Sequence, residues 1–186
     1  MQELRYLKLL AYLALTQTTA GRRFISAKLG LGEGIVRRVI EAGREQGHLA
    51  VNKAGAKITR EGAAFLGEVL ALCGLRLLAY SQSFGSRLCG KICVAFGYKK
   101  AVDDVVKFRD MIVRHGGCGA IIALPRAGQI YIPLAERTLE ELDAEMADIV
   151  KGNIKEAETV IISCGDNFGQ ALAPIDVACM MMEPGR

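Results

Sequence analysis

The chain has 186 residues, 51% of them hydrophobic and 24% charged, which suffices for one or two packed domains and excludes an intrinsically disordered protein. The formal net charge of +4 is unevenly distributed. Residues 1–89 contain 13 Lys and Arg against 6 Asp and Glu, whereas residues 90–186 contain 11 against 14. We therefore expect a polyanionic partner for the first half only.

The N-terminal apolar run is interrupted by Arg5 and Lys8 and lacks a small-residue cleavage site, which argues against a signal peptide or a transmembrane helix. None of the six cysteines forms a CxxC pair, and their spacing matches no zinc site, so we expect no metal and no cofactor. Several cysteines lie in apolar, strand-like runs. We therefore expect them to be free, small hydrophobic residues in a reducing cytoplasm.

An amphipathic helix is predicted over residues 3–16, because its apolar side chains recur at helical spacing. The residues expected on the buried face are Tyr6, Leu9, Leu10 and Leu13. The residues expected to lie away from it are Arg5, Lys8 and Tyr12. A polar loop follows and ends in Arg22 and Arg23, which either hold a phosphate or are simply solvated.

A helix-turn-helix is predicted from residue 24 onward. Its second helix has Val36, Val39, Ile40 and Gly43 on one stripe, at positions i, i+3, i+4 and i+7. Gly30 suits the tight turn between the helices, because glycine adopts left-handed backbone angles without steric cost. Gly32 and Gly34 keep the start of the second helix thin, and in helix-turn-helix proteins that end approaches the bases. An ordinary helical hairpin in a core is the alternative.

A two-stranded hairpin is predicted next, with strands at residues 48–52 and 56–59 and a loop in which Gly55 permits positive φ. Thr59 is expected to cap a helix over residues 60–72, in which Glu61 suits the helix dipole. A helix-turn-helix followed by such a hairpin, or wing, is the order of elements in a winged helix. Lys53 and Lys57 would extend from the wing towards phosphates.

The segment AKLGLGEGIVRRVIEAGREQGHLAVNKAGAKITREG resembles winged-helix transcriptional regulators. With the later segments KFRDMIVRHGGCGAIIAL and IYIPL, the whole chain resembles an archaeal family of unknown function that joins a winged helix to a C-terminal α/β domain. This resemblance implies a winged-helix fold and DNA binding for the first part. It implies no known chemistry for the second part.

We expect a winged-helix domain at residues 1–74, a connector at 75–90 and an α/β effector-binding or dimerisation domain at 91–186. Residues 75–80 are too apolar for a free linker, whereas residues 81–90 are expected to be a looser hinge. The last part has the predicted order β-α-β-β-α-β-α, with Thr138 opening a capping box. This α+β order favours a ferredoxin-like sandwich over a doubly wound sheet, because a hairpin lies in its middle.

The second domain lacks the sequence motifs of common enzymes, namely GxGxxG, the P-loop, HExxH and GxSxG, and we expect no catalytic activity. Gly116 and Gly117 lie between a helix and a strand, which favours a sharp turn with a helix C-cap over a phosphate-binding loop. Cys118 and His115 lack an orienting third group, so a catalytic Cys-His pair is not expected.

Arg109 is predicted on the apolar stripe of a helix over residues 102–115, where an unpaired charge is costly to bury. A structural ion pair or a side chain that extends to water explains it, and so does an anionic ligand. In the ligand hypothesis, Arg109 lines an effector pocket with Asp166 and Asn167 at the C-terminal end of the last strand.

The sequence thus predicts a cytoplasmic, homodimeric regulator that binds double-stranded DNA and senses a small anionic effector, with no membrane association. Arg37 is expected at a base edge and Arg38 at a base or a phosphate, with Glu33 on the exposed side of the same helix. Further phosphate contacts are expected from Lys28, Arg44, Lys53 and Lys57. The alternatives are a winged helix used for protein contacts, an enzyme in the second domain, and RNA as the polyanion.

Overall fold

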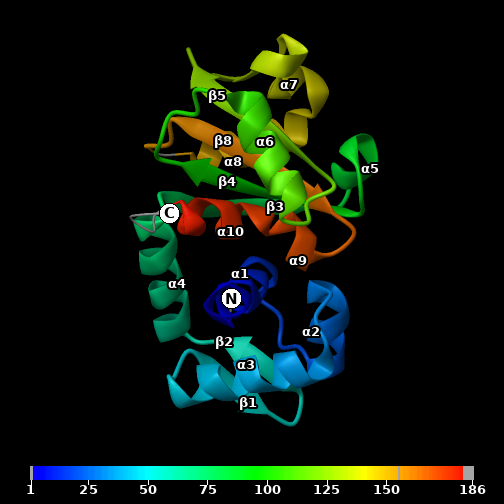
Figure 1. The fold of residues 1–186 in the computed structure, drawn as a ribbon, viewed down its shortest axis with the longest axis vertical. Coiled ribbons are helices and arrows are strands. Elements are labelled where there is room, and N and C mark those ends of the chain that lie inside the picture. The colour runs from blue at the N-terminus through cyan, green and yellow to red at the C-terminus, as the bar shows by residue number, and fades with distance from the viewer. Residues whose placement is uncertain (1, 155, 182–186) are drawn as a thin grey trace.

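In the computed structural model, which describes residues 2–154 and 156–181, the chain has an α+β fold (Figure 1). N-terminal helices with a small β-hairpin precede a six-stranded antiparallel sheet that carries further helices. The N-terminal elements are α1 (Gln2–Thr16), α2 (Arg22–Leu29), α3 (Glu33–Glu45), β1 (Leu49–Asn52), β2 (Gly55–Ile58) and α4 (Arg60–Leu72).

The remaining elements build the sheet and the helices on it. The strands are β3 (Leu75–Ser81), β4 (Ile92–Tyr98), β5 (Gly119–Arg126), β6 (Gln129–Ile132), β7 (Arg137–Thr138) and β8 (Thr159–Gly165). The helices are α5 (Gly85–Leu88), α6 (Val105–Arg114), η1 (Pro133–Ala135), α7 (Leu139–Leu142), α8 (Ala144–Asn153), α9 (Phe168–Ala171) and α10 (Ala173–Met180). The helix predicted over residues 138–151 is divided at Asp143. The last helix, predicted over residues 168–182 with an interruption at Pro174, is divided at Leu172, and Pro174 lies in the first turn of α10. Residue 182 lies outside the described residues.

The strand order is β3-β4-β8-β5-β6-β7, with every neighbouring pair antiparallel. The predicted ferredoxin-like arrangement is wrong in one respect. A split βαβ unit is present, because β4 and β5 run parallel on either side of one strand, but that strand is β8 and not the hairpin strand β6. Predicted strands alone do not specify the order, since β8 and β6 each contain apolar residues suited to a place inside the sheet.

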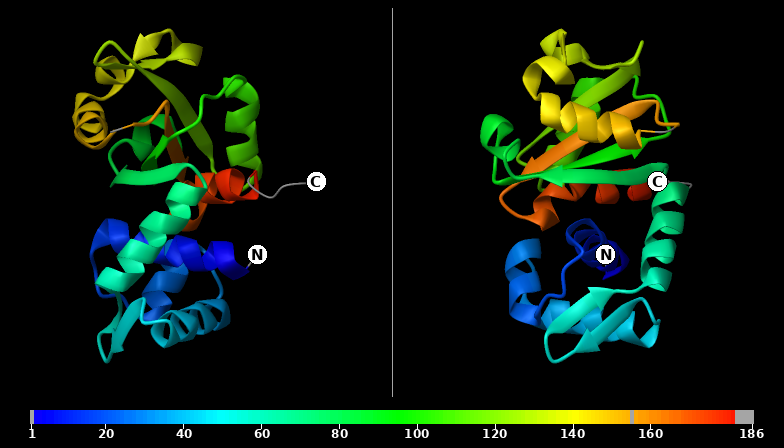
Figure 2. Two further views of the ribbon diagram at one scale, coloured as in Figure 1. Left: turned by 90° about the vertical axis from the view of Figure 1, so that its left-hand side faces the viewer. Right: turned by 180° about the vertical axis from the view of Figure 1, so that it is seen from behind.

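The sheet is buried on both faces. The face covered by α7 and α8 has its own apolar core, which includes Ile162 and Leu139. The opposite face is covered by α6 and α10, and its core continues without interruption into the N-terminal helices through residues such as Phe96, Phe168 and Leu10. The N-terminal part is therefore packed on the sheet part through a shared core (Figure 2).

Helix α1 lies between the two parts and is buried on two sides. Leu9, Leu10 and Leu13 are buried as expected. Tyr12 and Lys8 were expected to lie away from the core, and this prediction is wrong. Tyr12 is 1% exposed and packs edge-on against Phe168, with the ring centroids 4.9 Å apart. A single-face pattern underestimates the burial of a helix that contacts a second body.

The predicted connector belongs to the sheet. Residues 75–81 form the edge strand β3, which pairs with β4. Residues 81–90 were expected to be a loose hinge, but Phe84 is fully buried, and Arg87 forms an ion pair with Asp143 at 3.3 Å. The glycine and serine content of this segment suggested a flexible hinge, but its one buried aromatic residue, Phe84, holds it in the core.

All six cysteines are paired, contrary to the expectation of free thiols. The disulfides are Cys73–Cys179, Cys89–Cys118 and Cys93–Cys164. Cys93 and Cys164 lie directly opposite each other on β4 and β8. Cys73 caps the C-terminus of α4, so its bond to Cys179 joins that helix to α10. The partners are 29 to 106 residues apart, and local spacing gives no sign of such pairing.

Candidate nucleic-acid interface

The turn between α2 and α3 holds the two helices at a fixed angle. Gly30 ends α2 in the left-handed conformation, with φ of 63°, as predicted. The backbone N–H groups of Gly30 and Leu31 both donate to the carbonyl of Ser26. Gly32 and Gly34 have open space where a side chain would be, so the start of α3 is thin. These features leave the N-terminal end of α3 accessible to a bulky partner.

The hairpin is fixed to the helices by backbone contacts. Ala20, in the loop before α2, exchanges two hydrogen bonds with Ala56 of β2, at 3.0 and 2.9 Å. Gly55 has φ of 135° and lies against the carbonyl of Ala20, so a side chain there would clash with backbone. Thr59 accepts a hydrogen bond from the N–H of Gly62 at 3.0 Å, which confirms the predicted cap of α4. The hairpin is thus held beside α3.

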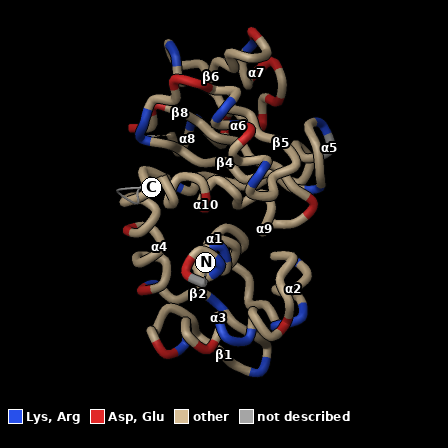
Figure 3. The backbone as a smooth tube through the Cα atoms, in the orientation of Figure 1, with Lys and Arg blue, Asp and Glu red and all other residues tan. Residues whose placement is uncertain are grey.

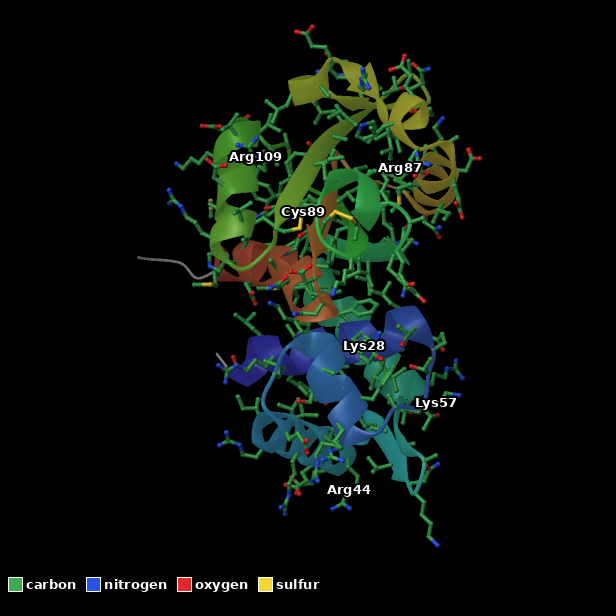
Figure 4. The ribbon with its side chains drawn as sticks, turned by 90° about the vertical axis from the view of Figure 1, so that its right-hand side faces the viewer. Lys28, Arg44, Lys57, Arg87, Cys89 and Arg109 are labelled. Carbon is green, nitrogen blue, oxygen red and sulfur yellow. A yellow bond between two sulfur atoms is a disulfide. The ribbon has the colours of Figure 1, made fainter. Side chains whose placement is uncertain are left out.

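The side chains predicted to contact DNA lie on the surface of this end of the molecule. Lys28 is half-buried, and its ammonium lies 5.2 Å from the ring centre of Phe24. The exposed residues of the set are Arg22, Arg23, Glu33, Arg37, Arg38, Arg44, Lys53 and Lys57. Lys28, Arg44 and Lys57 are spread over the half of the molecule away from the sheet (Figure 4).

A groove of about 360 Å³ collects four of these cations. Arg22 comes from the start of α2, Arg37 and Arg44 come from α3, and Lys53 comes from the hairpin loop. The groove also contains Val51, which is 42% exposed, and Asn52. Three separate elements therefore bring positive charge to one concave surface.

Two glutamates of α3 lie among the cations. Glu33 is 3.6 Å from Arg22 and 3.4 Å from Arg23, so it joins α3 to the start of α2. Glu41 accepts a hydrogen bond from Arg37 at 2.9 Å, and this bond is the main reason that the pKa of Glu41 lies below its ordinary value. The same bond raises the pKa of Arg37. Both carboxylates are exposed, so the arginines exchange them for another anion at little cost.

The acidic second half does not cover this surface. The hairpin and α3 lie at one end of the molecule and the six-stranded sheet at the other, with α1, α9 and α10 between them (Figure 1). The charges on the backbone trace show arginine and lysine gathered on α2, α3 and the hairpin (Figure 3). Among the described residues, no ion pair links these elements to the acids of residues 90–186.

The residues predicted to bind an effector do not come together. Arg109 is 39% exposed and pairs with its neighbour Asp110 at 2.9 Å, so it is not buried on the apolar stripe of α6. Arg109 lines a cavity beside β5, whereas Asn167 lines a different cavity beside α1, and Asp166 is exposed. Asn167 caps α9 by accepting from the N–H of Gln170. The predicted trio is therefore wrong as a single site.

Two contributors to the groove, Val51 and Asn52, were not predicted from the sequence. Asn52 accepts a hydrogen bond from the N–H of Ala54 at 2.8 Å and so shapes the hairpin loop that presents Lys53. The sequence Asn-Lys-Ala-Gly contains this information, because asparagine commonly bonds to the backbone two residues later. Val51 carries no comparable sign, since an exposed apolar residue in a short strand is common.

Comparison with known proteins adds a family match for the second half. Residues 89–178 match the family model of a domain of unknown function, DUF4443. The structure is also similar to that of hypothetical protein PH0730 from Pyrococcus horikoshii OT3, with a TM-score of 0.70 and 21% sequence identity. That match covers 96% of this chain and 92% of the other, so it extends over both halves of the fold. The chain matches no curated protein. Within the described residues, none of the helices has the length and apolar character needed to cross a membrane.

Proposed function

We propose that the chain is a DNA-binding transcriptional regulator whose residues 1–74 act as a winged helix. The observation that carries the proposal is the groove in which Arg22, Arg37, Arg44 and Lys53 converge from α2, α3 and the hairpin. A row of cations around a protruding helix matches the regular negative charge of a duplex. The second part is the regulatory or dimerisation module in this proposal.

In the bound state, α3 enters the major groove with its thin N-terminal end first. Arg37 exchanges Glu41 for a base edge, where a guanidinium forms two hydrogen bonds with guanine. Arg38 contacts a base or a phosphate, and Glu33 stays with Arg22 and Arg23 to orient them towards the backbone. The cations assigned to phosphates are Lys28, Arg44, Lys53 and Lys57. A homodimer would bind paired half-sites about one helical turn apart.

The proposal places the protein in the cytoplasm, where it meets the chromosome. Three disulfides are unusual in that compartment, except in hyperthermophilic archaea and bacteria, whose intracellular proteins are rich in disulfides. An archaeal, heat-adapted source reconciles the two observations. The resemblance of the sequence to an archaeal family supports the same conclusion.

The test measures binding to a mixed-sequence DNA duplex by fluorescence anisotropy over a series of salt concentrations. The wild type should lose affinity linearly on a log-log plot, with a slope of about −0.9 per neutralised phosphate. Replacing Arg22, Arg37, Arg44 and Lys53 together with alanine should reduce that slope by about 2.7, because three of the four residues neutralise phosphates and Arg37 contacts a base, and should reduce the affinity by at least about 100-fold.

A matched control removes the same charge elsewhere, with alanine at four exposed cations outside the groove. The control residues are Arg76, Lys99, Arg114 and Arg126. This variant should bind DNA within about threefold of the wild type, because long-range charge contributes little at physiological salt. Equal losses in the two variants, or no salt-dependent binding by the wild type, would refute the proposal. Tighter binding to an RNA duplex of the same sequence would assign the groove to RNA instead.

A further inference from the structure

A second cavity, of about 500 Å³, lies where the two parts of the molecule meet. One wall is formed by α1, the end of α2 and the turn that follows it. The other wall is formed by α9, α10 and His115 at the end of α6. Cavities of this size hold small organic ligands in other proteins, and interfaces between structural parts are a common place for them.

The charges around this cavity do not cancel. Lys8 donates to Asp176 at 2.6 Å and to the carbonyl of Gly169 at 3.0 Å, and both charged side chains are less than 15% exposed. That pair is therefore neutral and complete. Arg5, one turn earlier on α1, also lines the cavity and is half-buried, yet it has no ion pair within residues 2–154 and 156–181. The cavity keeps a net positive charge.

The remaining polar groups leave atoms available for a ligand. His115 is exposed and donates from Nδ1 to the carbonyl of Met111 at 2.8 Å, so its Nε2 is not used by that bond. The side-chain oxygen of Gln170 accepts from the N–H of Asp166 at 2.8 Å, which leaves its amide N–H₂ as a donor. The Gln170 amide is therefore a donor on the wall opposite Arg5, and the Nε2 atom of a neutral His115 is an acceptor.

Apart from Asn167 and two glycines, the rest of the lining is apolar and consists of Leu4, Leu29, Leu31 and Met180. A ligand that fits both kinds of wall needs an anionic group for Arg5 and a hydrocarbon body for the leucines. Inorganic anions lack the second feature, and neutral lipids lack the first. The lining therefore selects for an amphipathic carboxylate.

We propose that this cavity binds a small organic carboxylate with an apolar body, whose charge pairs with Arg5. The bound molecule touches both parts of the protein, including Gly30 and Leu31 in the turn before α3. The two parts already meet at this point, because Gly169 lies against the backbone carbonyl of Leu29 and Gly30 lies against the side-chain amide of Asn167. A ligand here consequently fixes α2 relative to α9 and α10.

The test titrates the full-length protein with octanoate by isothermal calorimetry, below the concentration at which octanoate forms micelles. Octanoate should bind saturably with one molecule per chain. Acetate, which lacks the apolar body, and 1-octanol, which lacks the charge, should each bind at least tenfold more weakly. Similar affinity for octanoate and 1-octanol, or no saturable octanoate binding, would overturn the proposal.

Two adjacent methionines provide a matched pair of variants. Met180 and Met181 are 53% and 52% exposed, but only Met180 lines the cavity. Met180→Glu places a negative charge at the ligand and should weaken octanoate binding at least tenfold. Met181→Glu adds the same charge beside it and should change binding less than twofold. Equal effects of the two substitutions would contradict the proposed site.

A second pair of variants tests the cationic side without relying on added charge. Arg5→Met should weaken octanoate binding at least tenfold, while Arg114→Met, at an exposed arginine next to His115, should leave it unchanged. The melting temperature of each variant establishes that it is folded. DNA is absent from these titrations, so their result tests octanoate binding independently of the proposed DNA binding. Wild-type affinity in Arg5→Met would refute the pairing with Arg5.

Discussion

At the end formed by α2, α3 and the hairpin, the surface carries a concentration of arginine and lysine, and residues 1–72 contain no cysteine. At the sheet end, the acidic residues outnumber the basic ones, and all three disulfides involve its strands, loops or last helix. The basic end is stabilised by the apolar core that it shares with the sheet end. The sheet end has covalent crosslinks in addition to its two cores.

This difference separates the proposed binding surface from the part that carries the crosslinks. Exposed cations repel one another, so a surface suited to a polyanion contributes little to folding. The covalent stabilisation lies in the other part, and the shared apolar core and the Cys73–Cys179 bond connect that part to the basic end through α1 and α4. We therefore expect substitutions at the sheet end to lower the stability of the protein more than substitutions at the basic end, and we expect DNA to change the titration of a glutamate at the basic end only.

The largest effect is expected from the disulfide between α4 and α10. Replacing Cys73 and Cys179 with alanine opens a crosslink between residues 106 positions apart, and loop-closure entropy then predicts a loss of about 4.7 kcal/mol. The same change at Cys89 and Cys118, 29 positions apart, should cost about 3.6 kcal/mol. Guanidinium unfolding monitored by circular dichroism measures both. A larger loss for the shorter loop would contradict the loop-closure explanation.

An intermediate effect is expected at the buried ion pair between the two parts. Lys8→Met leaves Asp176, which is 14% exposed, without its cation and should destabilise the protein by about 3 kcal/mol. The double variant Lys8→Met with Asp176→Leu should recover most of that loss, because no unpaired charge remains. Arg37→Met removes one partner of an exposed pair and should leave the melting temperature nearly unchanged.

If Lys8→Met were as stable as the wild type, α1 would not be held to α10 through this pair. The alternative result, in which the double variant is as unstable as Lys8→Met, would assign the effect to lost packing of the lysine side chain instead. Thermal unfolding of all four proteins in one buffer distinguishes these outcomes.

The smallest effect is a change in the titration of two glutamates. The pKa of Glu41 is lowered by its hydrogen bond with Arg37. For Glu140, at the sheet end, burial raises the pKa, but hydrogen bonds from Lys151 and from the backbone outweigh burial and leave the pKa lowered. Each ionised carboxylate stabilises the fold above its unfolded pKa, and that contribution is lost as the pH falls through the lower, folded pKa.

DNA should distinguish the two glutamates. If Arg37 exchanges Glu41 for DNA, the pKa of Glu41 rises on binding, and the protein takes up protons and binds more tightly as the pH falls through that range. The pKa of Glu140 should stay constant. Carboxyl NMR titrations with and without a duplex measure both values, and Arg37→Ala alone should raise the pKa of Glu41. A constant value for Glu41 in the complex would show that Arg37 does not leave it.

Local features of the sequence predict the basic end well. Gly30 in the left-handed conformation, Thr59 as a cap and the exposure of Arg37 each depend on a few neighbouring residues, and each was found as expected. The capping box at Thr138 and Glu141 shows that a local feature of the sheet end is predicted equally well.

The features that failed depend on distant parts of the chain. Tyr12 and Lys8 are buried because α9 and α10 pack on a second side of α1, which periodicity within α1 cannot indicate. The position of β8 in the sheet determines that Cys93 meets Cys164, and strand order is not encoded in any one strand. Arg109 was placed on the apolar stripe because a helical wheel gives its direction but not the width of the element that covers it. Its exposure and its ion pair with Asp110 agree with the expected structural pair or side chain extending to water, and not with a shared effector pocket.

The burial of α1 on two sides has a consequence for synthesis on the ribosome. Lys8 and Asp176 are separated by 168 positions, so α1 is translated long before α10. At 5–20 residues per second, the interval is roughly 8–34 s. During that time the ring of Tyr12 and the neighbouring apolar surface stay exposed to water, and the nascent chain depends on chaperones or on rapid elongation to avoid aggregation.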